Sequence, residues 1–310
     1  VLTYDSAATI EACLASLAAQ HRHPGEVIVV DDDSTDHTLR LVRRFAATGV
    51  LPVRVIRNGS HNISRGRNLG LAAARTELVA FLDSDARAEP GWVAGLVDAF
   101  ADERVAVVGG DVVVDHATAF AAAIAVNDGA VRELATAGEL LVSGCNMAVH
   151  TARVGGQRFD ERWVHAEDIE YVDRVGGWAV APAAVVWHES RATVRGYARQ
   201  MYRYGLWKVR YTIHTGNLRL VDWTPLVAVA GALALGVTVS PWWLLAYPAL
   251  SVAETTVVAA WRRPAARLLP LMLLGWLVKN TGWGLGTLVA LAQQVTGRSR
   301  IPRGAALEGI

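Results

Sequence analysis

Two carboxylates one residue apart, Asp83 and Asp85, follow directly on the apolar run Leu78–Leu82. A charged side chain at the end of a buried strand is costly unless a partner or a ligand compensates it. One interpretation is a polar loop whose acids cap the next helix. The other is a site for Mg²⁺ or Mn²⁺, which takes oxygen ligands from one or two carboxylates and from phosphates. The tripeptide alone leaves both open.

Two further acidic groups stand at comparable places in the sequence. Asp31–Asp33 closes the apolar run Glu26–Val30, and Glu167-Asp168 occurs in the segment HAEDIEY. Each has a structural alternative, because acids are also favoured in capping turns and in the first turn of a helix. Whether they share a site with Asp83 depends on the elements that carry them.

Those elements alternate between strand and helix up to about residue 110. Apolar runs predict strands at Glu26–Val30, Val53–Ile56 and Leu78–Leu82, and helical spacing of apolar residues separates them. Continuous apolar strands alternating with helices predict an α/β domain with a mainly parallel sheet covered on both faces. Ligands of such sheets bind beyond the carboxyl ends of the strands. We therefore expect the acidic groups after the strands to face one crevice.

Six segments together resemble the family 2 glycosyltransferases of GT-A fold. They follow that family's motifs in order and spacing over roughly residues 1–190, and they are VLTYDSA, VVDDDSTDHT, SRGRNLGLA, FLDSDA, SGCNMAVH and HAEDIEY. The resemblance implies a Rossmann-like GT-A domain that transfers a sugar, with inversion, from a nucleotide-sugar donor. More weakly, RQMYRYGLWKVR and NTGWGLG resemble exopolysaccharide glycosyltransferases of the succinoglycan type, which act on lipid-linked acceptors at the cytoplasmic membrane face.

The resemblance also implies roles for individual residues at the donor. Donor or nucleotide contacts are expected from Thr3, Tyr4, Asp32, Arg67 and Asp83. Asp32 matches the carboxylate that accepts a hydrogen bond from the base, with a uridine donor favoured, and a carboxylate suits an imide N–H because it offers only acceptors. A guanidinium such as Arg67 could neutralise the diphosphate, and its alternative is a surface salt bridge.

Metal, catalytic and acceptor roles follow in the same way. Asp85 matches the ligand of a Mg²⁺ or Mn²⁺ ion, and His188 is either a further metal or diphosphate contact or a structural histidine. Asp168 matches the general base that takes the acceptor's proton, with Glu167 orienting it or contacting the acceptor. Asn146 is expected near the acceptor or the donor sugar.

Charge divides the chain into two different parts. Residues 1–190 carry a net charge of −10, whereas residues 191–310 carry +11 and seven of the eleven Trp residues. A basic part that is also rich in apolar side chains and Trp indicates membrane contact and argues against nucleic-acid binding.

The apolar segments predict the form of that contact. Glu254 is the only charged residue from Pro225 to Trp261, a length that fits two crossings of about 19 residues joined at Ser240-Pro241. A third stretch, Leu268–Ala292, is either a crossing or a hairpin broken at Lys279-Asn280 and its glycines. The positive-inside bias favours the hairpin, because a third crossing would carry the arginines of the tail outside. We therefore expect an even number of crossings and a cytoplasmic tail.

The segment 191–222 is expected to be a basic amphipathic helix in the membrane interface. Its arginines recur every four residues, at Arg191, Arg195, Arg199 and Arg203. Such a stripe beside apolar and aromatic residues is attracted to anionic head groups. Gln200, Arg203 and Tyr204 partly match the Gln-x-x-Arg-Trp motif of processive polysaccharide synthases and are candidate acceptor contacts, with Tyr204 in place of the Trp.

These observations predict a GT-A catalytic domain over residues 1–190, an interfacial region over 191–222 and membrane helices with a basic tail over 223–310. Two cysteines, Cys13 and Cys145, indicate no disulfide framework and a reducing compartment. The chain also opens at Val1 inside an expected strand, which suggests that residues precede it. The expected protein is a multi-pass enzyme of the cytoplasmic membrane acting on a lipid-linked or polysaccharide acceptor. The alternatives are a processive synthase and a catalytically silent sugar-nucleotide-binding module.

Overall fold

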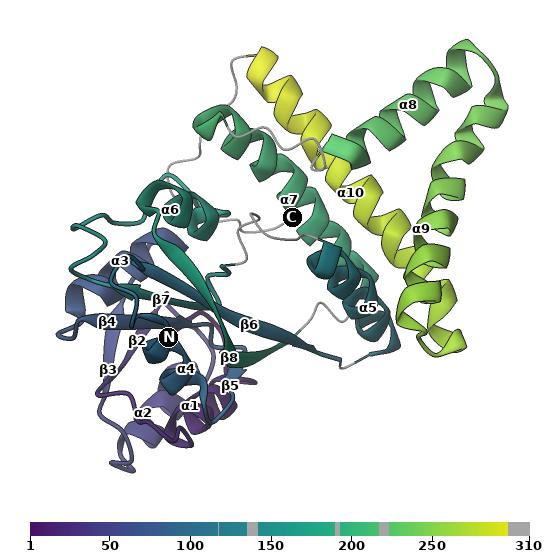
Figure 1. Cartoon of the computed structure of the whole chain (residues 1–310). Helices are drawn as coiled ribbons and strands as arrows, with labels where there is room; N and C mark the ends of the chain where they lie inside the picture. The colour runs from purple at the N-terminus through teal and green to yellow at the C-terminus, as the bar shows by residue number, and fades with distance from the viewer. Residues whose placement is uncertain (117, 135–141, 190–192, 217–222, 297–310) are drawn as a thin grey trace. The chain divides into compact units, whose positions relative to one another are not determined.

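The computed structural model describes residues 1–116, 118–134, 142–189, 193–216 and 223–296. The described chain forms two compact units (Figure 1). The first contains residues up to Val114 and the segment that ends at Glu189. The second contains one helix from the middle of the sequence and the helices from Val194 onward.

The first unit is an α/β domain with strands and helices in alternation. Its elements are β1 (Leu2–Thr3), α1 (Ile10–Ala18), β2 (Val27–Asp31), α2 (Thr38–Ala46), β3 (Val53–Arg57), α3 (Ile63–Ala73), β4 (Leu78–Leu82), β5 (Ala86–Ala88), α4 (Trp92–Ala99), β6 (Val107–Asp115), β7 (Asn146–His150), α6 (Glu167–Val175) and β8 (Trp178–Glu189).

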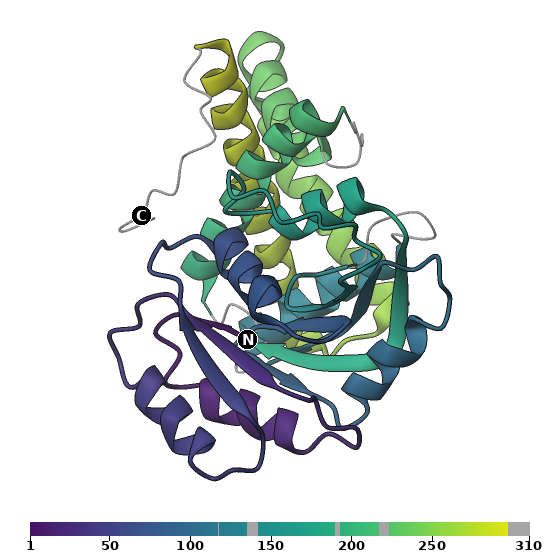
Figure 2. The same cartoon turned by 90° about the vertical axis from the view of Figure 1, so that its left-hand side faces the viewer.

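A parallel sheet in the order β1-β2-β3 begins this unit. The chain then returns through α3 to β4, which lies beside β1 through a parallel bridge between Leu2 and Asp83. Because the direction of winding reverses between β3 and β4, α3 covers one face of the sheet while α1 and α2 cover the other (Figure 2). The reversal makes the border between β1 and β4 a topological switch point, which is where ligands of such sheets bind.

The prediction of a mainly parallel sheet is wrong for the second sheet. Its order is β4-β7-β6-β8-β5, and the pairs β4–β7, β6–β7 and β5–β8 are antiparallel. The strands nevertheless look like parallel ones in sequence because both faces are buried. In β7, Met147 and Val149 pack into one apolar core while Ala148 packs into the other. Burial on both sides removes the alternation that would have marked antiparallel pairing.

The second unit consists of helices. They are α5 (Ala119–Leu134), α7 (Val194–Thr215), α8 (Thr224–Thr238), the short η2 (Pro241–Leu245), α9 (Ala246–Arg262), the short η3 (Ala266–Leu268) and α10 (Leu269–Val295). Assignment of α5 to this unit differs from the expected boundary at residue 190. Its buried residues Ala123 and Ala130 pack with Met272 and Trp276 of α10.

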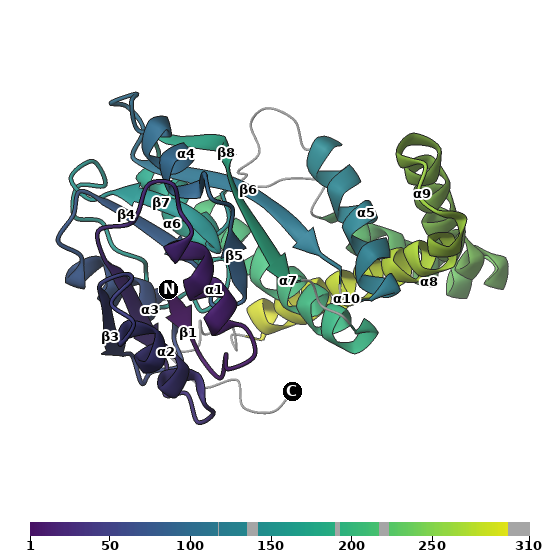
Figure 3. The same cartoon turned by 90° about the horizontal axis from the view of Figure 1, so that it is seen from below.

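Glycines let α7 and α10 lie side by side and parallel (Figure 3). A Cβ at Gly282 would lie 3.0 Å from the carbonyl oxygen of Ala198, and a Cβ at Gly286 or Gly205 would collide with the facing backbone. Small residues four apart allow such close contact between helices. The face of α7 around Gly205 is therefore covered by α10. Val194 and Ile213 are exposed, as are Arg195 and Arg199, and Arg191 lies outside the described residues.

The expected hairpin in Leu268–Ala292 is wrong, because α10 is one continuous helix of 27 residues. The residues interpreted as breakers make contacts between helices instead. Lys279 pairs with Asp128 of α5 at 2.9 Å, and Asn280 donates to Glu254 of α9. Without that hairpin, the prediction of an even number of crossings is no longer supported.

The expected turn at Ser240-Pro241 is confirmed between α8 and η2. In the described chain, one helical stretch is long and apolar enough to cross a membrane, the 22 residues Pro241–Arg262. α8 has 15 residues and is shorter. Two complete crossings therefore remain a prediction.

Candidate active site

The acidic residues after β1, β2 and β4 lie at one edge of the first unit. Thr3 pairs with Asp31 in the parallel register of β1 and β2, and Asp83 bridges to Leu2. The carboxyl ends of the three strands therefore coincide at the switch point, as expected from the sequence.

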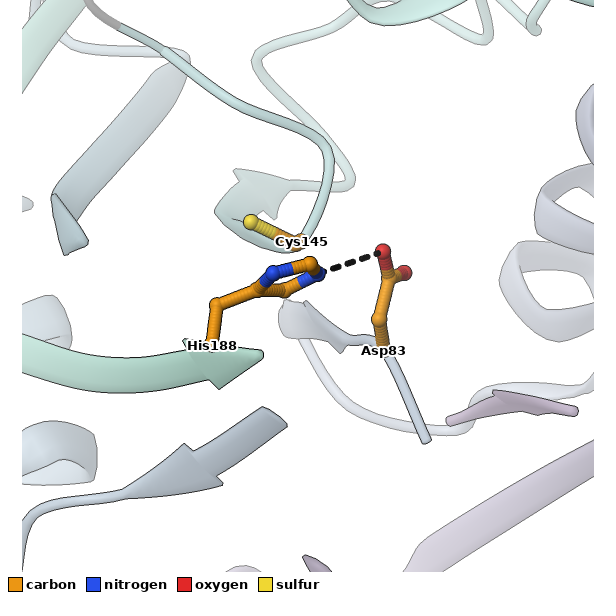
Figure 4. A group of neighbouring side chains, drawn as sticks. All are labelled: Asp83, Cys145 and His188. Atoms are coloured by element: carbon orange, nitrogen blue, oxygen red, sulfur yellow. Dashed lines mark ion pairs between the residues drawn. The ribbon is translucent and has the colours of Figure 1, made fainter. Parts of the chain in front are cut away.

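Asp83, Asp85 and His188 form a cluster at this edge. Antiparallel pairing of Ala86 in β5 with His188 in β8 brings the imidazole to the turn after β4. His188 Nε2 lies 3.2 Å from Asp85 Oδ1. It also lies 4.0 Å from Asp83 Oδ2, and Figure 4 shows this pair. The three side chains are about a quarter to a third exposed, so a ligand can reach them.

The donor set suits a divalent cation. Carboxylate oxygens are the ligands that Mg²⁺ and Mn²⁺ prefer, and imidazole is an accepted additional ligand of transition metals. Burial raises the pKa of the Asp83 carboxyl above its ordinary value, Arg67 and His188 oppose that rise, and the nearby carboxylates Asp85 and Asp168 add to it. A bound cation would offset this repulsion between carboxylates.

Cys145 lies beside this cluster. One potential ligand atom each from Asp83, Cys145 and His188 lies within 4.8 Å of the others. Burial raises the pKa of the Cys145 thiol to about 12, so it is protonated at neutral pH, and Ser143 Oγ lies 3.2 Å from its sulfur. Cys13 and Cys145 are both free and buried.

The Glu167-Asp168 pair begins α6. The preceding residue, Ala166, has a left-handed backbone with φ of 58°. Asp168 Oδ2 accepts a hydrogen bond of 2.7 Å from the Gly144 N–H, and Oδ1 accepts one of 2.8 Å from the Ile169 N–H. These donors hold the carboxylate in one orientation without occupying all of its lone pairs. The pair therefore stands at a helix N-terminus, and the role of Asp168 as the base stays a prediction.

Arg67 is enclosed in the protein, with 2% of the residue exposed. Its Nη1 donates to Glu167 Oε1, and its guanidinium lies 5.4 Å from the Phe159 ring centroid. Although burial alone would lower it, the attraction of Glu167 raises the pKa of Arg67, which stays charged. Arg67 forms a salt bridge, but the pair is buried and not on the surface as the alternative had it. The predicted donor contact fits less well, because the charge is already paired and enclosed.

Gly144 is a residue of this site that sequence reasoning missed. A Cβ at this position would collide with the Arg67 guanidinium, so only glycine lets the backbone approach and place its N–H on Asp168. The Gly in SGCNMAVH precedes a strand, but nothing local in the sequence indicates that it packs against an arginine 77 positions earlier.

A second cluster surrounds Asp32. Its Oδ1 accepts from the backbone N–H groups of Ser60 at 3.1 Å and His61 at 2.9 Å. The Tyr4 ring is 52% exposed and meets the His61 ring edge to face at 5.3 Å. Thr3 is buried, and its hydroxyl has no hydrogen-bond partner among the described residues. His61, which the sequence analysis did not single out, belongs to this cluster.

Asn146 does not lie where a sugar could reach it. Its side chain has no exposed surface, and its Oδ1 accepts from Trp92 Nε1 at 2.7 Å. Its amide N–H groups donate to the carbonyls of Asp111 and Ala184. The expected sugar contact is corrected to a structural role, because every proton of the amide is used inside the protein.

The candidate acceptor residues lie on α7 in the second unit. Gln200 Nε2 donates to Tyr204 Oη at 3.0 Å, and the Tyr204 ring meets the Trp283 ring edge to face at 6.0 Å. Arg203 is half-buried on the same helix. Contact of these three residues with an acceptor stays a prediction.

Comparison with known proteins shows which family the first part of the chain resembles. Residues 1–122 match the family described as Glycosyl transferase family 2. Chondroitin synthase of Escherichia coli is 35% identical over 111 residues, which cover 34% of this chain and 16% of that protein. Succinoglycan biosynthesis protein ExoO of Rhizobium meliloti is 34% identical over 116 residues, covering 37% of this chain and 31% of that protein. The matches thus span less than a third of the length of these curated relatives.

A solved structure gives the fold. The mannosyltransferase PcManGT from Pyrobaculum calidifontis, in complex with GDP-Man and Mn²⁺, superposes with a TM-score of 0.59 at 22% identity, covering 94% of this chain and 85% of that one. Residues 1–122 are therefore similar to the glycosyl transferase family 2, and this likeness and the sheet topology together give the GT-A fold.

Proposed function

We propose that the protein is an inverting, metal-dependent glycosyltransferase that moves a sugar from a nucleotide-sugar donor to a hydroxyl of a lipid-linked or polysaccharide acceptor. The observation that carries this proposal is the convergence of Asp83, Asp85 and His188 with Asp168 at the switch point of a family 2 domain. Asp83, Asp85 and His188 suit a cation and a diphosphate, and Asp168 offers a base.

The donor end of the site suits a nucleotide. Asp32 Oδ1 accepts from two backbone N–H groups, and Oδ2 has only His61 Nδ1 near it, at 3.9 Å, among the described residues. Oδ2 can therefore accept from an imide or amide N–H of a base. The exposed Tyr4 ring offers an apolar surface beside it. A uridine donor is favoured, and the ordered carboxylate is equally able to accept from another base that carries a ring N–H.

Asp83, Asp85 and His188 would hold Mg²⁺ or Mn²⁺. When bound, the ion would neutralise charge on the diphosphate that leaves the sugar. Asp168 takes the proton from the attacking hydroxyl, and the Gly144 N–H fixes the carboxylate for that purpose. The buried Arg67–Glu167 pair anchors the start of α6, so the base is mounted on a rigid element.

Membrane attachment is the second part of the proposal. The stretch Pro241–Arg262 has the length and composition of a membrane span. Large apolar side chains are exposed on α8, η2 and α9, among them Val237, Trp242 and Val257. They support a cytoplasmic-membrane enzyme whose catalytic domain uses cytosolic donors.

A binding screen tests the proposed function. The full chain in detergent is titrated with nucleotide-sugars, with and without Mn²⁺, and its melting temperature is recorded, because a donor that binds the native state raises it. We expect a metal-dependent rise with one nucleotide class, lost in Asp85→Asn and kept in the charge-matched surface control Asp98→Asn. Donor binding without nucleotide release would instead identify a catalytically silent module. Loss of the rise in both variants would refute the metal site.

A further inference from the structure

Arg210 of α7 is a buried charge without an opposite charge. It is 8% exposed. Its Nη2 donates to Gln293 Oε1 of α10 at 2.9 Å, and its guanidinium lies 4.7 Å from the Trp207 ring centroid. Its Nε is enclosed without a hydrogen-bond partner. Among the residues that the structure describes, no carboxylate pairs with Arg210.

Two other cations that are buried or mostly buried in the described chain are paired with acids. Arg67 in the first unit has Glu167, and Lys279 in the second unit has Asp128. A guanidinium taken out of water without an anion is costly, and a neutral amide with an aromatic ring compensates only part of that cost. Unlike Arg67 and Lys279, Arg210 has no acid beside it in the described chain, which points to an anion supplied from outside the chain.

The position of Arg210 indicates which anion is accessible. It lies in the second-last turn of α7, and Gln293 lies in the last turn of α10, so both stand near the ends of the two parallel helices. Lys208 and His214 lie in the last two turns of α7, as Arg210 does. The sequence has no acid between Arg191 and Arg219. Arg210 donates to no backbone carbonyl in the described chain, so the helix end itself does not take up its charge.

The surroundings are also apolar. Ile213, one turn from Arg210, is 56% exposed, and Val295 at the end of α10 is 90% exposed. The same unit contains the stretch that could cross a membrane. A ligand that joins a phosphate to an apolar body fits a buried guanidinium beside exposed aliphatic side chains, and anionic lipids have that chemistry.

We propose that Arg210 and Gln293 form a binding site for the phosphate of an anionic membrane lipid. The guanidinium donates to the phosphate through its terminal nitrogens, as its planar fork allows. Gln293 holds the fork in place through Nη2. The site does not depend on sugar transfer, so its failure and the failure of the proposed enzymatic function are separate results.

The test is lipid binding to the full chain in a neutral detergent. A short-chain phosphatidylglycerol is titrated while the melting temperature is recorded, beside the matched diacylglycerol, which lacks phosphate, and inorganic phosphate. We expect phosphatidylglycerol to raise the melting temperature and the other two compounds to act weakly or not at all. Arg210→Gln should weaken the apparent affinity by about tenfold to 100-fold, the range for losing charge-assisted hydrogen bonds.

Three variants separate this site from general charge attraction. Arg195→Gln removes the same charge from an exposed position of the same helix and should change the affinity less than twofold. Arg210→Lys keeps the charge without the fork and should lose part of the affinity. Gln293→Leu removes the one protein acceptor of Arg210, so it should lower stability without lipid and enlarge the rise that the lipid gives.

Three results would overturn the proposal. Equal weakening by Arg195→Gln and Arg210→Gln would show diffuse electrostatic attraction. An equal response to diacylglycerol would show that acyl chains suffice. Inorganic phosphate that binds as tightly as the lipid would show a site for free anions.

Discussion

The strongest consequence of the structure for stability concerns Arg67 and Glu167. Each side chain of this ion pair is less than a tenth exposed, at 2% and 7%. Arg67→Met keeps much of the side-chain volume and leaves Glu167 buried without its cation. Removing one partner of a buried pair costs about 3–5 kcal/mol in the free energy of unfolding. That is a large part of the about 5–15 kcal/mol that stabilises a typical protein.

Two matched variants make the effect specific to burial. Arg67→Met with Glu167→Met replaces the pair by apolar groups and should recover most of the lost stability. Arg104→Met breaks the pair with Asp102 on the surface, where the two side chains are 90% and 42% exposed. An exposed pair contributes about 0–1 kcal/mol, so this variant should be nearly neutral.

The assay is urea denaturation of the full chain in detergent, read by pulse proteolysis of the first unit. The expected order of stability is wild type and Arg104→Met highest, the double variant next, and Arg67→Met lowest. If Arg67→Met cost no more than Arg104→Met, the structural role of the pair would be refuted. If Arg67→Met lost donor affinity at unchanged stability, Arg67 would be a donor contact, as first predicted.

Four further predictions follow from the same structure. Asp85→Asn should abolish Mn²⁺-dependent donor binding in calorimetry while the metal-free melting temperature stays within the error of wild type; unchanged affinity would contradict the metal assignment. Asp168→Asn should keep donor binding and lower turnover by about 10²–10⁴-fold, the effect of losing a general base; a loss below tenfold would exclude it as the base. Gly286→Ala should destabilise the helical unit by about 1–3 kcal/mol through overpacking, whereas Gly231→Ala, which meets no atom within 4 Å, should be neutral or stabilising in the same denaturation experiment. Burial raises the pKa of Tyr171 to about 12, so its contribution to stability is complete below the unfolded pKa of about 10 and is lost as pH rises to 12. Between these two pH values the melting temperature of wild type should fall more than that of Tyr171→Phe. Equal slopes for the two proteins would contradict the burial of Tyr171.

The position of the acidic clusters could be predicted from sequence because it depends on local pattern and one topological rule. Apolar runs ending in Asp31 and Asp83 identify strand ends, and parallel winding brings those ends together. His188 could be placed beside them only by resemblance, because its contact with Asp85 depends on the pairing of β5 with β8.

Contacts between distant segments could not be predicted. Arg67 and Glu167 are 100 residues apart, and no local pattern pairs them. The motif around Asn146 indicated a functional position, but its buried hydrogen bonds to three separate segments were visible only in the fold.

In the helical unit, the prediction was wrong because residues that make contacts between helices were interpreted as helix breakers. The glycines of α10 looked like helix breakers because glycine is a poor helix former. In the fold they allow α7 to approach closely, and this packing compensates for their low propensity. Lys279 looked like a membrane-surface residue, but Asp128, from a helix 151 residues earlier, neutralises it.

The central claim is inverting, metal-dependent transfer from a nucleotide-sugar, and the anomer of the released sugar tests it most directly. The full chain is incubated with Mn²⁺ and the α-linked donor selected by the binding screen, with water as acceptor, and proton NMR follows the anomeric signal during the first minutes. We expect the β-anomer to appear first, together with the nucleoside diphosphate, and both signals to disappear when the metal is chelated. Initial release of the α-anomer, or release that persists without metal, would contradict the account.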